Sequence, residues 1–146
     1  MAELPALSTT RPDDWTYLAE GGANLVLAYS PSPRSSSSSS DSPDSPYRAR
    51  VLRLRKRELG GGPRGGRADD EFHASVIKRL LPGLAVDLER VSVDRAWLRE
   101  VVERLGNGAS RPVERTRADE VDLECESAVV AEDLVGGRGV IAVEIK

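Results

Sequence analysis

The sequence predicts an α+β fold, an antiparallel sheet with about two helices. Two observations predict it. Short apolar runs stand on either side of glycine-rich turns, which is typical of the strands of hairpins. Two longer segments repeat apolar residues every three or four positions, which is typical of amphipathic helices.

The expected strands share alternating apolar side chains and end at glycine, proline or polar residues. They cover residues 15–18, 24–29, 49–56, 88–93, 127–131 and 140–145. The first two flank a turn of sequence EGGAN, and the last two flank the glycine loop 136–139, so each pair is expected to form a hairpin.

The first expected helix runs from Asp69 or Asp70 to about Leu81, where Pro82 and Gly83 stop it. The second runs over residues 95–105 and is capped by Ser92 or Asp94. It carries an apolar stripe of Trp97, Leu98, Val101, Val102 and Leu105. We interpret this stripe as core packing and not as a cofactor site.

Three segments are expected to be disordered because they hold too few apolar residues to offset their ordering entropy. They are a leader over residues 1–13, a Ser/Pro insertion over 30–47 and a Gly/Arg insertion over 59–69. The Ser-Pro pairs are either phosphorylation sites or parts of a plain spacer. The Gly/Arg segment lacks the spacing of a phosphate-binding loop, so we interpret it as a loop only.

Composition excludes several classes of function. A net charge of −3 gives no support for DNA binding, and one cysteine with one histidine argues against a disulfide framework or a Cys/His zinc site. No apolar run reaches the roughly 20 residues of a membrane helix, and no secretory signal begins the chain. We expect a monomer in the nucleus or cytoplasm, with no membrane partner and no metal site in this chain.

The EGGAN turn raises the question of why two glycines stand together between strands. A plain β-turn is one answer. The other is a phosphate site, since glycine lets backbone N–H groups approach an anion closely. The strand that follows supplies Arg53 or Arg55, and Lys56, as cations that could neutralise phosphate.

Several segments together resemble the inositol-pentakisphosphate 2-kinase family. They are WTYLAEGGANLVLAY (15–29), VLRLRK (51–56), VIKRLLPG (76–83), RVSVDRAWL (90–98), RPVER (111–115) and VEIK (143–146). Members of the family carry an E-G-x-A-N turn and a V-E-I-K-P-K segment in this order. The resemblance covers residues 15–146 apart from the low-complexity segments.

The resemblance implies a kinase-like N-lobe over residues 14–146. The implied activity is ATP-dependent phosphorylation of inositol 1,3,4,5,6-pentakisphosphate at the 2-position, which gives inositol hexakisphosphate. It also implies Mg²⁺, whose ligands are expected with the catalytic base in a second lobe that this chain lacks. We therefore expect an inactive fragment with no catalytic residue of its own.

The implied site residues follow from the matched motifs. For ATP they are Gly21, Gly22, Ala23, Asn24, Arg53, Glu132, Asp133 and Glu144, and for the inositol phosphate they are Arg115 and Lys146, with Arg111 as a further cation. At the connection between lobes the match is loose, because Glu132 stands in place of an asparagine and Leu134 in place of a histidine. Backbone contacts to adenine would survive these changes.

Two other classes of function remain open. One is a non-catalytic remnant that binds nucleotide or inositol phosphate. The other is an RNA-associated protein, which only the Gly/Arg and Ser/Pro tracts suggest.

Overall fold

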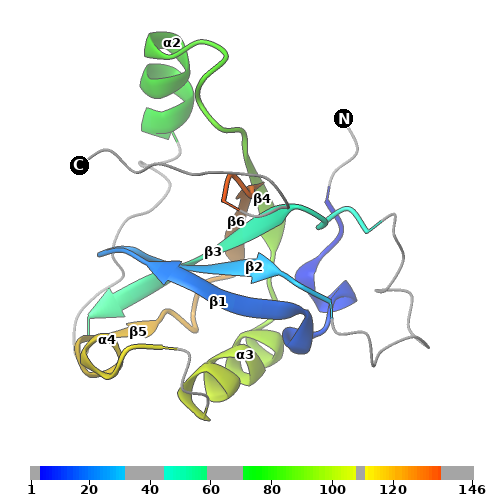
Figure 1. The fold of residues 1–146 in the computed structure, drawn as a ribbon, viewed down its shortest axis with the longest axis vertical. Coiled ribbons are helices and arrows are strands. Elements are labelled where there is room, and N and C mark those ends of the chain that lie inside the picture. The colour runs from blue at the N-terminus through cyan, green and yellow to red at the C-terminus, as the bar shows by residue number, and fades with distance from the viewer. Residues whose placement is uncertain (1–3, 32–44, 59–70, 108–110, 136–146) are drawn as a thin grey trace.

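A computed structural model describes residues 4–31, 45–58, 71–107 and 111–135. Within them a six-stranded antiparallel sheet has helices on two sides (Figure 1). The strands are β1 (Trp15–Glu20), β2 (Asn24–Tyr29), β3 (Arg50–Glu58), β4 (Leu88–Ser92), β5 (Asp119–Val121) and β6 (Ser127–Glu132). The helices are α2 (Lys78–Leu80), which continues a π-helical turn at His73–Ile77, α3 (Arg95–Asn107) and α4 (Val113–Ala118). The predicted α+β fold is confirmed.

Strand β3 is the centre of the sheet, whose order is β1-β2-β3-β6-β4. Residues 51–55 of β3 pair with β2 on one edge, and residues 50–53 pair with β6 on the other. Its last residues pair with β5, as in Lys56 opposite Val121. Three strands far apart in sequence therefore depend on the position of β3.

One face of the sheet is buried beneath α3, as Figure 1 shows. Asp94 starts this helix, because its carboxylate accepts hydrogen bonds from the backbone N–H groups of Ala96 (2.7 Å) and Trp97 (3.3 Å). The predicted helix and its cap are thus confirmed. The core between helix and sheet comprises Leu25, Leu27, Leu52, Leu54, Val91, Trp97, Leu98, Val101 and Val130. Each of these large side chains contributes about 1.5–3 kcal/mol by leaving water.

The opposite face we call the open face. It carries Val26, Ala28, Val51, Arg53, Arg55, Val129 and Ala131, as the strand registers require. The helical segment that ends in α2 lies on this side, at the β4 edge, where His73 and Lys78 line a small cavity with Arg90 and Val129. In Figure 1, α2 and α3 stand on opposite sides of the sheet. The middle of the open face therefore has no helix over it among the described residues.

The prediction of a disordered leader over 1–13 does not hold for residues 4–13. Leu7 has 0% exposed surface, and two 3-10 turns, Leu7–Thr9 and Pro12–Asp14, lead into β1. Thr10 joins this segment to the core, since its hydroxyl accepts from Trp15 Nε1 (2.9 Å) and its carbonyl from Trp97 Nε1 (3.1 Å). The polar composition of this segment suggested disorder, but burial of Leu7 and the hydrogen bonds from two tryptophans to Thr10 hold it in place.

The predicted insertions lie mostly at residues 32–44 and 59–70, outside the described residues. The end of the first one is ordered, however, and this part of the prediction is wrong. Tyr47 is 1% exposed and packs edge to face on Trp15, with ring centroids 5.6 Å apart. The hairpin expected over 136–145 falls outside the described residues too. The helix expected to reach Leu81 ends at Leu80, and its Phe72 and Leu80 remain exposed among the described residues.

The order of the leader gives a stability test. We expect Leu7→Ala to lower the free energy of unfolding by about 2–5 kcal/mol, because the change leaves a cavity in the core. Urea unfolding followed by tryptophan fluorescence measures it. Leu84→Ala is the control, since Leu84 is 80% exposed and its loss should change stability by less than about 0.5 kcal/mol. Equal effects of the two variants would mean that the leader does not pack.

Candidate functional site

The connection between β1 and β2 is a closed turn docked on β3. Gly21 N–H donates to the carbonyl of Asn24 (2.9 Å), which closes the turn. Lys56 N–H donates to the carbonyl of Ala23 (2.8 Å), which fixes the turn to the central strand. The predicted turn residues therefore lie beside the C-terminal part of β3.

Gly21 is not required by the fold that surrounds it. Its φ lies outside the left-handed region, and a Cβ added there meets no atom within 4 Å. Neither backbone conformation nor packing thus explains a glycine at this position. The space next to the turn is open to a ligand that approaches the backbone.

Arg53 lies on the open face one strand from the turn. It pairs in register with Val26 on β2 and with Val129 on β6. Its neighbour on the same face, Arg55, lies opposite Asn24, and both arginines are half-exposed. The structure therefore brings the predicted strand cation and the predicted turn to the same region.

Lys56 has a different environment, because it points to the core face with Leu52 and Leu54. Its ammonium group has 0% exposed surface and lies 3.1 Å from Glu20 Oε2 and 2.9 Å from Asp119 Oδ2. Lys56 was one of the three cations that the sequence offered for phosphate, but it is buried in the fold and paired with carboxylates. The alternation of the strand is the signal that could have separated it from the arginines.

Arg111 completes this group of buried charges. Its guanidinium grips Glu20 with two hydrogen bonds, Nε to Oε1 (3.2 Å) and Nη2 to Oε2 (2.9 Å), and Nη1 donates to the carbonyl of Asp119 (3.1 Å). We call Glu20, Lys56, Arg111 and Asp119 the buried charge network. The expectation that Arg111 serves the substrate directly is not supported, because Glu20 already occupies its fork.

The network holds the Glu20 carboxyl ionised. Burial acts to raise the pKa of Glu20, but hydrogen bonds from Arg111 and Lys56 outweigh it and leave the pKa below its ordinary value. Because the unfolded carboxyl keeps the ordinary value, this contribution to stability is present at neutral pH. It is lost as the pH falls through the lowered pKa.

Glu132 and Asp133 lie at the other end of β3. Glu132 pairs in register with Arg50, and Asp133 N–H donates to the carbonyl of Ala49 (2.8 Å). The Asp133 carboxylate accepts from Val135 N–H (3.0 Å). These hydrogen bonds fix the backbone of the chain just after β6.

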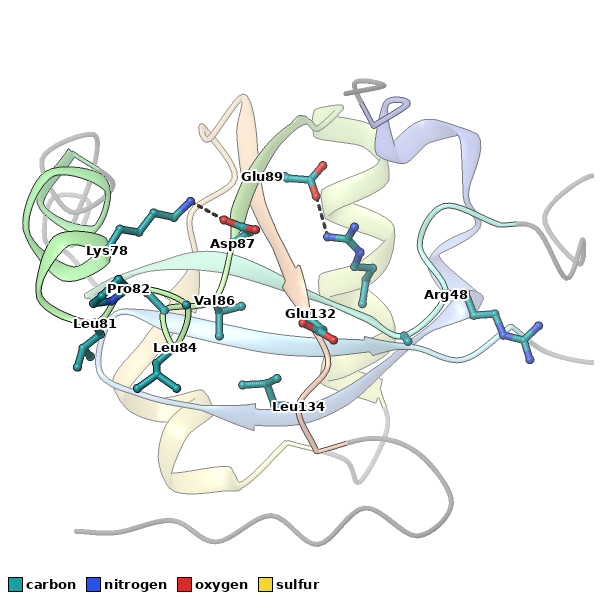
Figure 2. Close-up of a pocket in the computed structure, with 14 residues that line it drawn as sticks. Arg48, Lys78, Leu81, Pro82, Leu84, Val86, Asp87, Glu89, Glu132 and Leu134 are labelled. Carbon is teal, nitrogen blue, oxygen red and sulfur yellow. Dashed lines mark hydrogen bonds and ion pairs between the residues drawn. The ribbon is translucent and has the colours of Figure 1, made fainter.

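Glu132 opens onto a groove of about 1060 Å³, which Figure 2 shows from the side of α2 and the loop 81–87. An ion pair between Arg50 and Glu89 (2.7 Å) and another between Lys78 and Asp87 line it. Leu84 and Leu134 supply apolar, largely exposed surface. The groove therefore combines apolar walls with two internal ion pairs and the Glu132 carboxylate, which suits an uncharged ring better than a phosphate.

The candidate residues follow the line of β3. From Arg50, opposite Glu132, to Lys56, beside Ala23, the strand advances about 20 Å, with Arg53 midway. Arg115 lies on the exposed helix α4, close to the Arg111 end of the buried charge network. Glu144 and Lys146 lie outside the described residues.

In the parts of the chain that the structure describes, no group of three or more His, Cys, Asp or Glu side chains could hold a metal ion. No helix there is long and apolar enough to cross a membrane.

Comparison with known proteins gives a consistent result. The sequence model of a protein family described as inositol-pentakisphosphate 2-kinase matches residues 17–146. Two curated proteins named inositol-pentakisphosphate 2-kinase, from Cryptococcus neoformans var. neoformans serotype D strains JEC21 and B-3501A, are each 26% identical over 149 aligned positions. The alignments cover 94% of this chain and 32% of each relative, so the chain spans about a third of their length.

Loss of Lys56 should be severe. We expect Lys56→Met to lower the free energy of unfolding by about 3–5 kcal/mol, because it leaves Glu20 and Asp119 buried without their common cation. Urea unfolding monitored by the buried Trp15 and Trp97 measures the change.

The control for this prediction is Arg57→Met, on the same strand. Arg57 forms a half-exposed pair with Glu120 (2.6 Å), so its loss should change stability by about 1 kcal/mol or less. Similar values for the two variants would contradict a structural role for the buried lysine.

Proposed function

Because the chain belongs to the inositol-pentakisphosphate 2-kinase family, we propose that it forms the nucleotide-binding lobe of an enzyme that phosphorylates inositol 1,3,4,5,6-pentakisphosphate. The phosphate would pass from ATP to the 2-hydroxyl, giving inositol hexakisphosphate. The observation that carries the proposal is the order of three features along β3. They are the open turn at Gly21, the half-exposed Arg53, and the hydrogen-bonded backbone at Asp133.

The chain's residues would divide the nucleotide between them. The open Cβ position of Gly21 would let the phosphates approach the backbone of the turn closely, and the Arg53 guanidinium would neutralise their charge. The backbone at Glu132 and Asp133 would hydrogen-bond the adenine, with the apolar wall at Leu134 beside it. ATP supplies the phosphoryl group, and what this lobe contributes is orientation and charge neutralisation.

The inositol phosphate would meet α4. The substrate carries many charges on a small ring, so it needs arginines that can grip phosphate oxygens in a fork. Arg115 is exposed on α4, and Arg111 ties the start of this segment to Glu20, the residue before the glycine turn. The buried charge network would thus hold the substrate arginine at a set distance from the nucleotide. We assign Glu144 to the nucleotide and Lys146 to the inositol phosphate substrate on the basis of their motif alone.

The catalytic base and the Mg²⁺ ligands would come from residues beyond those described. No group of acids among the described residues could hold a metal ion. The second candidate, a non-catalytic binding remnant, uses the same nucleotide site. Sequencing the transcript past the codon for Lys146 separates the two, since a frame that continues into a basic second lobe supports the enzyme.

Gly21 gives the sharpest test of the nucleotide site. We expect Gly21→Ala to leave the free energy of unfolding within about 0.5 kcal/mol of wild type, because the added methyl meets no protein atom. Affinity for ATP, measured by isothermal titration calorimetry, should fall about tenfold, because the methyl keeps phosphate from the backbone N–H groups.

Gly106→Ala is the matched control. Gly106 also has an open Cβ position and a φ outside the left-handed region, but it lies on α3, which covers the face of the sheet opposite to Arg53 (Figure 1). It should leave ATP affinity unchanged. An equal affinity for ATP in both variants and the wild type would exclude the turn as a phosphate site.

The chain alone should bind without completing the reaction. We expect the purified 146-residue chain to form no inositol hexakisphosphate from ATP and inositol pentakisphosphate in an assay read by ³¹P NMR. The reason is that phosphoryl transfer requires a catalytic base and a metal ion in addition to positioning and charge neutralisation by this lobe. Product formation by this chain would show that it already contains both.

A further inference from the structure

Three arginines of β3 occupy alternate positions and therefore the same face of the sheet: Arg53, Arg55 and Arg57. Arg57 is neutralised across the strands by Glu120, Nε to Oε1 at 2.6 Å. Arg53 and Arg55 form no ion pair and donate no side-chain hydrogen bond to any residue that the structure describes. The charges of Arg53 and Arg55 are therefore not neutralised by any described carboxylate.

Arg55 lies closer to the glycine turn than Arg53 does. Its register partner is Asn24, the residue that ends the turn, whereas the partner of Arg53 is Val26. The two arginines stand about 7 Å apart along the strand, so their like charges repel unless an anion lies between or beside them. The core face of the same strand shows the contrast, because there Lys56 is matched by two carboxylates.

The order along β3 gives each arginine its own part of the nucleotide. Glu132, at the proposed adenine end, is opposite Arg50. Arg53 follows, and then Arg55 beside the turn. A nucleotide laid along this line reaches Arg53 with its first phosphate and Arg55 with its terminal ones.

We propose that Arg55 is a second phosphate-binding residue of the nucleotide site, which grips the terminal phosphates of a nucleoside triphosphate while Arg53 holds the phosphate nearest the ribose. This inference rests on the proposed function of the chain. Its consequence is discrimination by phosphate number, since only Arg53 would contact a monophosphate. The competing reading is that Arg55 is a solvated side chain on the exposed part of a strand.

The test is the affinity of the 146-residue chain for ATP, ADP and AMP, measured by calorimetry at one fixed salt concentration. The variants are Arg53→Gln, Arg55→Gln and Arg57→Gln, which remove the same charge from one face of the same strand. We expect Arg55→Gln to weaken ATP binding about tenfold or more and AMP binding by about twofold or less, because a charge-assisted contact is lost only with ATP. Arg53→Gln should weaken all three nucleotides.

Arg57→Gln measures the effect of net charge alone, and Arg55→Lys measures the need for the guanidinium fork. We expect the first to change the affinity for ATP by about twofold or less, because the Arg57 charge is matched by Glu120. The affinity of Arg55→Lys for ATP should lie between those of the wild type and Arg55→Gln. Urea unfolding of each variant checks that the fold is retained.

The outcomes separate this inference from the proposed function. If Arg53→Gln weakens ATP binding but Arg55→Gln matches Arg57→Gln, the nucleotide site stands and the role of Arg55 is overturned. If Arg55→Gln weakens AMP as much as ATP, Arg55 does not read the terminal phosphates and the inference is wrong. If the wild-type chain binds no nucleotide, the nucleotide site proposed for this lobe falls, and the assignment of Arg55 falls with it.

Discussion

Lys56 ends the buried part of the central strand with a charge that has no contact with water. Its ammonium group is neutralised by Glu20 from β1 and Asp119 from β5, and Arg111 forms a further ion pair with Glu20. The desolvation of four charges offsets most of their attraction, so such a network adds little net stability over an apolar core of the same shape. What it does is fix position, since any movement of one member leaves a buried charge unmatched. The ends of β1, β3 and β5 and the start of α4 are thereby held to one another.

The same strand separates two kinds of cation by alternation alone. Side chains at even positions, from Leu52 to Lys56, enter the core, and those at odd positions, Arg53 and Arg55, lie on the open face. The core cation meets carboxylates within the protein, whereas no described acid pairs with Arg53 or Arg55. The sequence VLRLRK therefore places one buried structural charge and two available charges within the four residues 53–56. Position relative to the sheet, not residue type, decides between them.

Local patterns were sufficient for much of the fold. The alternation of β2 and β3, the apolar stripe of α3 and the Asp94 cap were all readable because each depends on neighbours within a few positions. The ordered leader was missed because its anchor is Trp97, far along the chain from Thr10. The roles of Lys56 and Arg111 were missed for the same reason, since their partners stand 36, 63 and 91 residues away. Helix α4 and β5 lie in a short polar segment that has no periodicity of its own.

The topology of the sheet also bears on how the chain reaches this state during synthesis. Strand β6 lies between β3 and β4 in space, yet it is the last described strand to be made. A ribosome that has released β1, β2 and β3 therefore presents one edge of the central strand without a neighbour until residue 132 emerges. Exposed apolar edges of this kind pair with other nascent chains. Arg53 and Arg55 place two like charges on the face of β3 beside that edge, and charges next to an unpaired edge oppose its pairing with another chain.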